Sequence, residues 1–105
     1  MRYYQNIDAF AAQRLIRGSR CCRILDVRDP AEFVAGHLPG AVNVPLYQIG
    51  RKVPYLMPNR RWPLIVYCGS GARSLPAVQV LSVMGYSNLY NLQKGIEYWP
   101  YPLVH

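Results

Sequence analysis

The segment "LIVYCGSGARSLPAVQVLSVMGY" (residues 64–86) joins a short apolar run, a glycine-rich loop and a longer apolar pattern. Residues 64–67 are apolar at every position, which is typical of a central parallel strand covered on both faces. Residues 74–84 are mostly apolar and predict a buried helix that ends at Gly85. Pro76 is compatible with that helix, because the amides of a first helical turn have no intrahelical partner. The segment therefore predicts a strand, a loop that begins at Cys68, and a helix.

The rest of the chain repeats this alternation of strand and helix. Further strands are predicted at 2–4, 23–27, 41–45 and 88–92, and further helices at 7–17, 30–36 and 95–99. Residues 46–63 predict one or two short helices and an exposed connection. In the first helix, Asp8 is expected in the first turn and Gly18 at the C-cap. The alternation predicts one α/β domain over residues 1–105 with a mostly parallel sheet.

The charge of the chain indicates which classes of partner it favours. The formal net charge is +7, from 12 basic and 5 acidic residues, and the basic residues are spread along the sequence. Such a field speeds the arrival of small anions and of an acidic protein partner. The sequence has no recognisable nucleic-acid-binding module, which argues against nucleic acid as the partner.

Several classes of protein are disfavoured by what the sequence lacks. Its apolar runs are too short to span a membrane, and its first ten residues lack the apolar core of a signal peptide. A soluble, cytoplasmic protein is therefore expected. The three cysteines, Cys21, Cys22 and Cys68, form no C-x-x-C pair and are odd in number, which argues against a disulfide framework and a zinc site. No cofactor and no metal are predicted.

The glycine-rich loop fits two phosphate-binding patterns poorly. Gly69 and Gly71 have the G-x-G spacing of a dinucleotide fold, but Ser74 stands in place of the third glycine. The ribose-binding acid expected about twenty residues later has only Glu97, in the last predicted helix, as a candidate. A P-loop is excluded because it needs a lysine, and none lies nearby.

A third interpretation starts from Cys68 itself. The residue follows a strand and precedes a helix, at the sheet edge where α/β folds bind ligands. Gly69 and Gly71 allow backbone amides to turn towards the sulfur, and such a nest of amides binds anions. The start of the helix near Ser74 and the charge of Arg73 add to the effect, so the loop is expected to favour a reactive thiolate. Cys21 and Cys22 lack such surroundings and are expected to be structural.

At this point the sequence resembles a single-domain rhodanese. The resemblance is carried by "LDVRDPAEFVAGHLPGAVNVPL" (25–46), "VYCGSGARS" (66–74) and "MGYSNLYNLQKGIEYW" (84–99), in the order expected of that family. It covers nearly the whole chain and implies a five-stranded parallel sheet flanked by helices. Lys94 departs from the family, which usually has a glycine there. Gly69 also departs, since larger or charged residues are common at that position.

The resemblance implies sulfur transfer through Cys68. Cys68 would attack the outer sulfur of thiosulfate or a similar donor, become a persulfide, and pass the sulfur to cyanide or a thiol. The amides of residues 69–73 would stabilise the negative charge, as in an oxyanion hole. Arg73 would attract an anionic donor, and Ser74 would cap the helix or contact substrate, with capping the favoured role. The substrate-binding residues implied are Gly69, Ser70, Gly71, Ala72, Arg73 and Ser74.

Other residues are expected to support the site. Asp26 and Arg28 end a strand at the same edge as Cys68 and would form a polar frame, with Glu32 close enough in sequence to pair with Arg28. His37, in "GHLPGA", is expected to shape a turn rather than to act as a general base, and Trp99 to fill the core.

Two rivals to a small-molecule sulfurtransferase stay open. The fold implied is similar to that of dual-specificity phosphatases and arsenate reductases. Phosphatases of the cysteine type have five residues between cysteine and arginine, whereas Cys68 and Arg73 are separated by four. The domain could instead relay a persulfide from a protein donor to a protein acceptor, which uses the same chemistry at Cys68.

Overall fold

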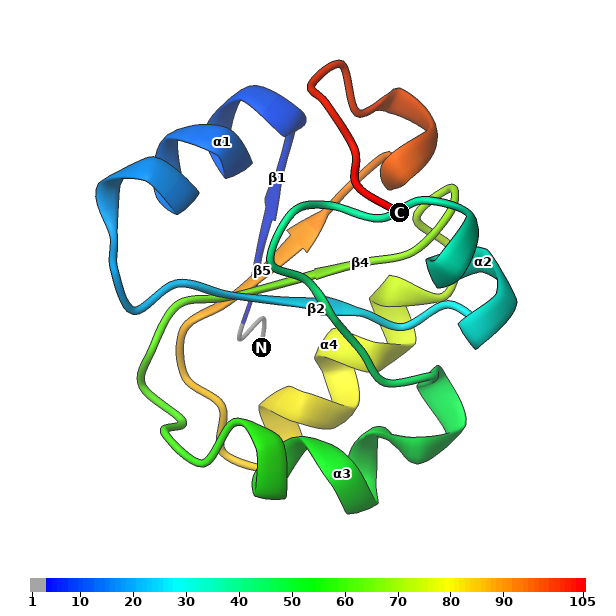
Figure 1. Ribbon diagram of the computed structural model, residues 1–105. Helices are drawn as coiled ribbons and strands as arrows, with labels where there is room; N and C mark the ends of the chain where they lie inside the picture. The colour runs from blue at the N-terminus through cyan, green and yellow to red at the C-terminus, as the bar shows by residue number, and fades with distance from the viewer. Residues whose placement is uncertain (1–3) are drawn as a thin grey trace.

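A computed structural model describes residues 4–105 and contains one sheet of five parallel strands (Figure 1). The strands are β1 (Tyr4–Ile7), β2 (Arg23–Asp26), β3 (Val42–Asn43), β4 (Leu64–Tyr67) and β5 (Leu89–Leu92). Their order in the sheet is β1-β5-β4-β2-β3. The predicted α/β class and parallel sheet are confirmed.

Helices connect the strands and cover the sheet. They are α1 (Ala9–Gly18), α2 (Pro30–Ala35), α3 (Ile49–Leu56) and α4 (Ser74–Val83), with short 3-10 helices η1 (Leu46–Gln48) and η2 (Ile96–Tyr98). Of the described residues, none belongs to a helix both long enough and apolar enough to span a bilayer.

The sheet separates two apolar layers, and β4 alternates between them. Leu64 and Val66 face a cluster that includes α3 and α4, whereas Ile65 and Tyr67 face a cluster that includes α1 and Trp99. All four residues of β4 are buried, as the apolar run predicts. Figure 1 shows α3 and α4 on one side of the sheet and α1 with the C-terminal segment on the other.

Some predicted boundaries were wrong. The helix expected from residue 7 starts at Ala9, because Ile7 ends β1 and Asp8 is the N-cap, where its carboxylate accepts the Ala11 amide at 2.8 Å. The C-cap of α1 is Ser19 rather than Gly18. Of the strand expected at 2–4, residues 2 and 3 lie outside the described part of the chain. The strand expected at 41–45 is only Val42–Asn43, because beyond it the amides of Val44 and Leu46 donate to the successive carbonyls of Asp26 and Val27, which interrupts the regular parallel pattern.

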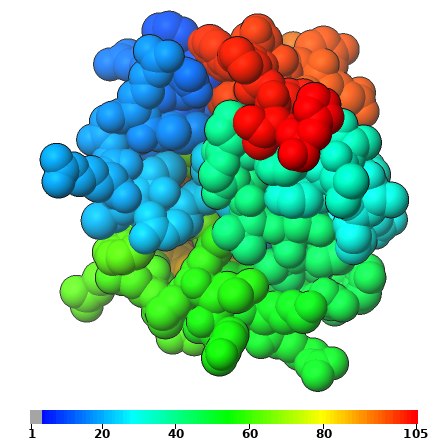
Figure 2. Space-filling model, viewed as in Figure 1, coloured from blue at the N-terminus to red at the C-terminus, as the bar shows by residue number. Residues whose placement is uncertain are grey.

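The C-terminal segment packs back onto the turn after α2. The backbones of His37 and Val104 exchange two hydrogen bonds of 2.9 Å, which form an isolated antiparallel bridge. In Figure 2 the C-terminal residues cover this turn. The imidazole of His37 stacks on Phe33, with ring centroids 3.7 Å apart, and its Nδ1 lies 2.9 Å from the Phe33 carbonyl. This confirms that His37 shapes the turn.

Candidate active site

Cys68 follows β4 directly and lies at the bottom of the loop that leads to α4. Only 1% of the surface of Cys68 is exposed to solvent. Two backbone amides donate to its Sγ atom, from Gly71 at 3.1 Å and from Ser74 at 3.3 Å. The Gly71 amide belongs to the predicted set, while the Ser74 amide lies one residue beyond it. Both place partial positive charge against the sulfur and can stabilise a negative charge there.

The conformation of this loop depends on Gly71. Its φ of +103° is a conformation that residues with a side chain rarely adopt, and a Cβ atom there would lie 2.2 Å from the Gln93 carbonyl oxygen. Gly69 is buried, whereas Ser70 and Ala72 are exposed. Gly71 therefore allows both the turn around the sulfur and the close approach of the segment after β5.

The segment after β5 supports the loop from below, which the sequence analysis missed. The Ile96 amide donates to the Cys68 carbonyl at 2.9 Å, and the Glu97 amide donates to the Gly69 carbonyl at 3.1 Å. Gly95 has a φ of +66°, and a Cβ atom there would lie 2.3 Å from the Gly69 carbonyl oxygen. The signal available in the sequence was the single glycine that follows the last strand.

Arg73 forms an ion pair with Glu32, and this corrects the predicted pairing of Glu32 with Arg28. The two guanidinium nitrogens lie 2.7 and 2.9 Å from the two carboxylate oxygens. The hydrogen bonds from Arg73 lower the pKa of Glu32 to about 2, and those to Glu32 raise the pKa of Arg73. The pair ties α2 to the active-site loop. The guanidinium of Arg73 is therefore already engaged by a carboxylate.

Arg28 instead pairs with Asp26, and both side chains are buried. Arg28 donates to Asp26 through Nε at 3.0 and 3.1 Å and through Nη2 at 2.7 Å, and Nη2 also reaches the Gly36 carbonyl at 2.7 Å. The Arg28 amide adds a bond of 2.9 Å to the same carboxylate. The polar frame predicted beside the loop thus consists of two separate ion pairs.

Ser74 does not cap α4, contrary to the favoured prediction. Arg73 occupies the N-cap position, and Ser74 is the first helical residue. Ser74 is fully buried, and its hydroxyl donates to the Gly71 carbonyl at 3.3 Å. It therefore closes the loop on itself, while its amide faces the sulfur. The predicted helix start at residue 74 and the core position of Trp99 are confirmed.

The other two cysteines lie at the opposite edge of the sheet, before β2. Burial raises the pKa of the Cys22 thiol to about 11, against a smaller opposing effect of the Arg23 charge. Such a thiol is a poor nucleophile near neutral pH. Cys22 packs against the apolar cluster that contains Trp99, in agreement with the predicted structural role.

Comparison with known proteins identifies the family. Residues 8–100 match the family model described as a rhodanese-like domain. The chain belongs to the rhodanese-like family. It is 31% identical to a protein named Sulfurtransferase from Allochromatium vinosum, over 89% of this chain and 85% of that one. It is 30% identical to the thiosulfate sulfurtransferase GlpE of Ectopseudomonas mendocina, over 94% of this chain and 87% of that one.

A solved structure supports the same assignment. The rhodanese-related protein of Thermoplasma volcanium is 30% identical in sequence, with a TM-score of 0.83 over 96% of this chain and 98% of that one. The rhodanese-like fold implied by the three motifs is therefore confirmed.

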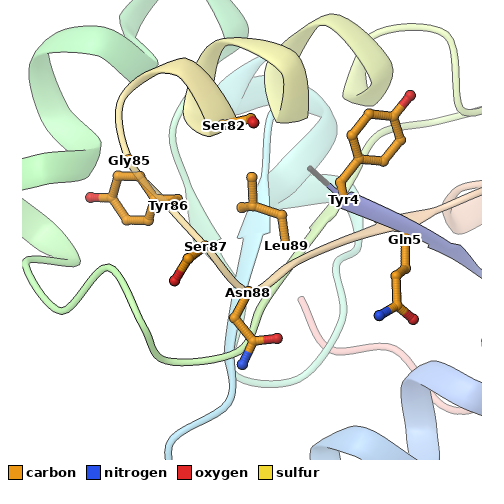
Figure 3. A pocket seen from close by; sticks show the side chains of 8 residues that line it. All are labelled: Tyr4, Gln5, Ser82, Gly85, Tyr86, Ser87, Asn88 and Leu89. Carbon is orange, nitrogen blue, oxygen red and sulfur yellow. The ribbon is translucent and has the colours of Figure 1, made fainter. Parts of the chain in front are cut away.

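A separate hollow of about 400 Å³ lies away from Cys68, between β1 and the turn from α4 to β5 (Figure 3). Tyr86 and Asn88 line it, and its lining within residues 4–105 includes no charged side chain. Among the described residues, no group of three or more His, Cys, Asp or Glu side chains is placed to hold a metal ion.

Proposed function

We propose that this rhodanese-like domain is a sulfurtransferase that carries sulfur as a persulfide on Cys68. The observation that carries the proposal is the pair of amides, from Gly71 and Ser74, directed at the Cys68 sulfur. They support a negatively charged sulfur at this position. The names of the two similar sulfurtransferases are in keeping with this chemistry.

The proposed reaction has two half-reactions. The Cys68 thiolate attacks the outer sulfur of thiosulfate, a bond forms between the two sulfurs, and the bond to the inner sulfur breaks. Sulfite leaves with the electron pair of that bond, and Cys68 keeps the persulfide. Cyanide or a thiolate then attacks the terminal sulfur, and Cys68 is released as thiolate. Ping-pong kinetics follow from the covalent intermediate.

The loop residues take different parts in this proposal. Gly69, Ser70, Gly71, Ala72 and Arg73 form the wall around the sulfur, and the Ser74 amide closes it. Because Glu32 engages Arg73, the guanidinium serves mainly to fix the loop, and its attraction for an anionic donor is reduced. Asp26 and Arg28 neutralise each other and hold the neighbouring strand end.

Arg73 and Arg28 are thus both paired with carboxylates, which favours a second candidate function, the relay of a persulfide between proteins. A donor of this kind carries its sulfur to Cys68 without needing a free cation for a sulfonate group. The same pairing opposes a phosphatase, since the guanidinium of Arg73 is directed to Glu32 and the loop has four residues between Cys68 and Arg73. We further propose that residues 1–105 form one domain and that it works in the cytoplasm.

Intact-protein mass spectrometry tests the proposal. After incubation with thiosulfate, or with glutathione persulfide for the relay, the wild type gains one sulfur. Cyanide removes it and yields thiocyanate. Cys68→Ser gains none, whereas the matched variant Cys22→Ser gains sulfur like the wild type. The proposal is rejected if neither donor loads the wild type, or if Cys68→Ser loads equally well.

A further inference from the structure

The charged residues of the chain are divided between the two edges of the sheet. All five acidic residues end or follow a strand, at the edge that carries Cys68. They are Asp8 after β1, Asp26 at the end of β2, Asp29 and Glu32 at the start of α2, and Glu97 after β5. The opposite edge has no acidic residue. The positive net charge is therefore concentrated away from Cys68.

We define the basic face as five arginines on the two segments that lead into β2 and β4. These are Arg17, Arg20, Arg23, Arg60 and Arg61. The two segments lie side by side, since the Arg23 amide donates to the Pro63 carbonyl at 2.8 Å. They are seen together in Figures 1 and 2, in light blue and green. Neither ion pair found in residues 4–105 involves any of the five.

An apolar cavity of about 130 Å³ adjoins the basic face, and Arg23 is the member of the face that lines it. Its floor contains Met57, Leu64 and Tyr86, which are nearly completely buried, and its walls include Leu56 and Trp62, which are 48% and 37% exposed. One side chain of leucine or phenylalanine size can fill such a volume, which is several times the ~30 Å³ that a water occupies in the liquid.

The chemistry of the face indicates its ligand. Guanidinium groups bind carboxylates through two parallel hydrogen bonds, which a lysine cannot do. The Arg23 guanidinium lies 4.5 Å from the centre of the Trp62 ring and covers it, so this indole is no stacking platform for a nucleic-acid base. A flat membrane surface presents no protruding side chain that would fill a cavity of this size. The combination fits an acidic peptide segment with one apolar anchor.

We propose that the basic face binds an acidic segment of a partner protein, whose apolar side chain enters the cavity beside Trp62. The face is separated from Cys68 by the length of β4, about 13 Å for four residues. A partner bound there leaves the active-site loop open. The interaction would hold the domain at its partner while Cys68 accepts or gives sulfur elsewhere.

Fluorescence anisotropy with two labelled peptides tests this. The first is Glu-Asp-Glu-Phe-Asp-Glu-Asp, and the second has serine in place of phenylalanine. At low salt the wild type is expected to bind the phenylalanine peptide about tenfold more tightly than the serine peptide. The double variant Arg20→Gln/Arg61→Gln is expected to lose about tenfold in affinity, whereas Lys94→Gln, at the other edge, changes it less than about twofold. Leu56→Asn should weaken binding and Val83→Asn, an exposed position on α4, should not.

Three results would overturn the proposal. They are equal binding of the two peptides, equal losses in Arg20→Gln/Arg61→Gln and Lys94→Gln, and tighter binding of duplex DNA or phosphatidylglycerol vesicles than of the phenylalanine peptide. Sulfur loading of Cys68, measured by mass on Arg20→Gln/Arg61→Gln and on Leu56→Asn, is expected to be unchanged. A failure of peptide binding is thereby distinguished from a failure of the sulfurtransferase chemistry.

Discussion

Replacing Gly95 by alanine tests how the segment after β5 supports the active site. A Cβ atom at this position would lie 2.3 Å from the Gly69 carbonyl oxygen and 2.6 Å from the Cys68 carbonyl oxygen. Since such contacts below 3.0 Å essentially never occur, the difference of 0.7 Å is the least by which the backbone must move. Both contacts involve backbone, so no flexible side chain can relieve them.

The expected loss has a conformational and a steric part. The φ of +66° with a ψ of −165° is a region that is essentially restricted to glycine, and a side chain there costs about 1–3 kcal/mol. Overpacking adds about 1–3 kcal/mol. The free energy of unfolding should therefore fall by about 2–6 kcal/mol. A displacement near 1 Å at the loop should also lower kcat/KM by about 100-fold.

Gly40→Ala is the matched control, because Gly40 has a φ of +81° but an added Cβ would meet no atom within 4 Å. This variant should lose about 1–2 kcal/mol and keep its activity. Urea denaturation gives the stabilities, and thiocyanate formation from thiosulfate and cyanide gives the activities. If Gly95→Ala behaves like Gly40→Ala in both assays, the supporting role of the segment is refuted.

Three further predictions concern charge and thiol chemistry. Because the folded-state pKa of Glu32 is lowered to about 2 from 4.5, its pairing with Arg73 stabilises the protein above pH 4.5 and is lost as the pH falls through 2. Glu32→Gln should thus be less stable than the wild type by about 1 kcal/mol or less at pH 7, and equally stable below pH 2, in urea titrations. With a pKa near 11, Cys22 should stay unmodified by iodoacetamide at pH 8 in peptide mass spectra. Asp26→Ala leaves Arg28 buried and unpaired and should cost about 3–5 kcal/mol by urea denaturation.

Each of these has a contrary outcome. A stability difference for Glu32→Gln that is constant between pH 2 and pH 7 would mean that the ion pair is not responsible for it. Labelling of Cys22 at the rate of a free cysteine would contradict its burial. For the buried pair, the double variant Asp26→Ala/Arg28→Met should recover part of the lost stability. No recovery would show that the uncompensated charge is not the cause.

The sequence was sufficient for the sheet because its strands carry a local signal. The uninterrupted apolar run of β4 requires cover on both faces, and the alternation with helices then requires parallel strands. Short strands gave a weaker signal. The length of β3 was overestimated. Ile7 was assigned to the helix although it pairs with Leu92 of β5.

The candidate site was predicted only as far as its residues are close in sequence. The glycine spacing around Cys68 was enough to place amides at the sulfur. The partner of Arg73 lies 41 residues away on α2, so the nearer Arg28 was chosen for Glu32. A carboxylate that can reach two arginines is assigned only by the fold, because both pairings satisfy the charge.

The sheet order has a consequence for the sequence of events in folding. β5 lies between β1 and β4, so β1, although it precedes all other strands in the chain, has no neighbour in the sheet until residues 89–92 are made. The carbonyls of Cys68 and Gly69 likewise wait for the amides of residues 96 and 97. Contacts between such distant segments slow folding. In a nascent chain that stops short of β5, β1 thus has no strand to pair with. The loop at Cys68 then also lacks the two hydrogen bonds that support it.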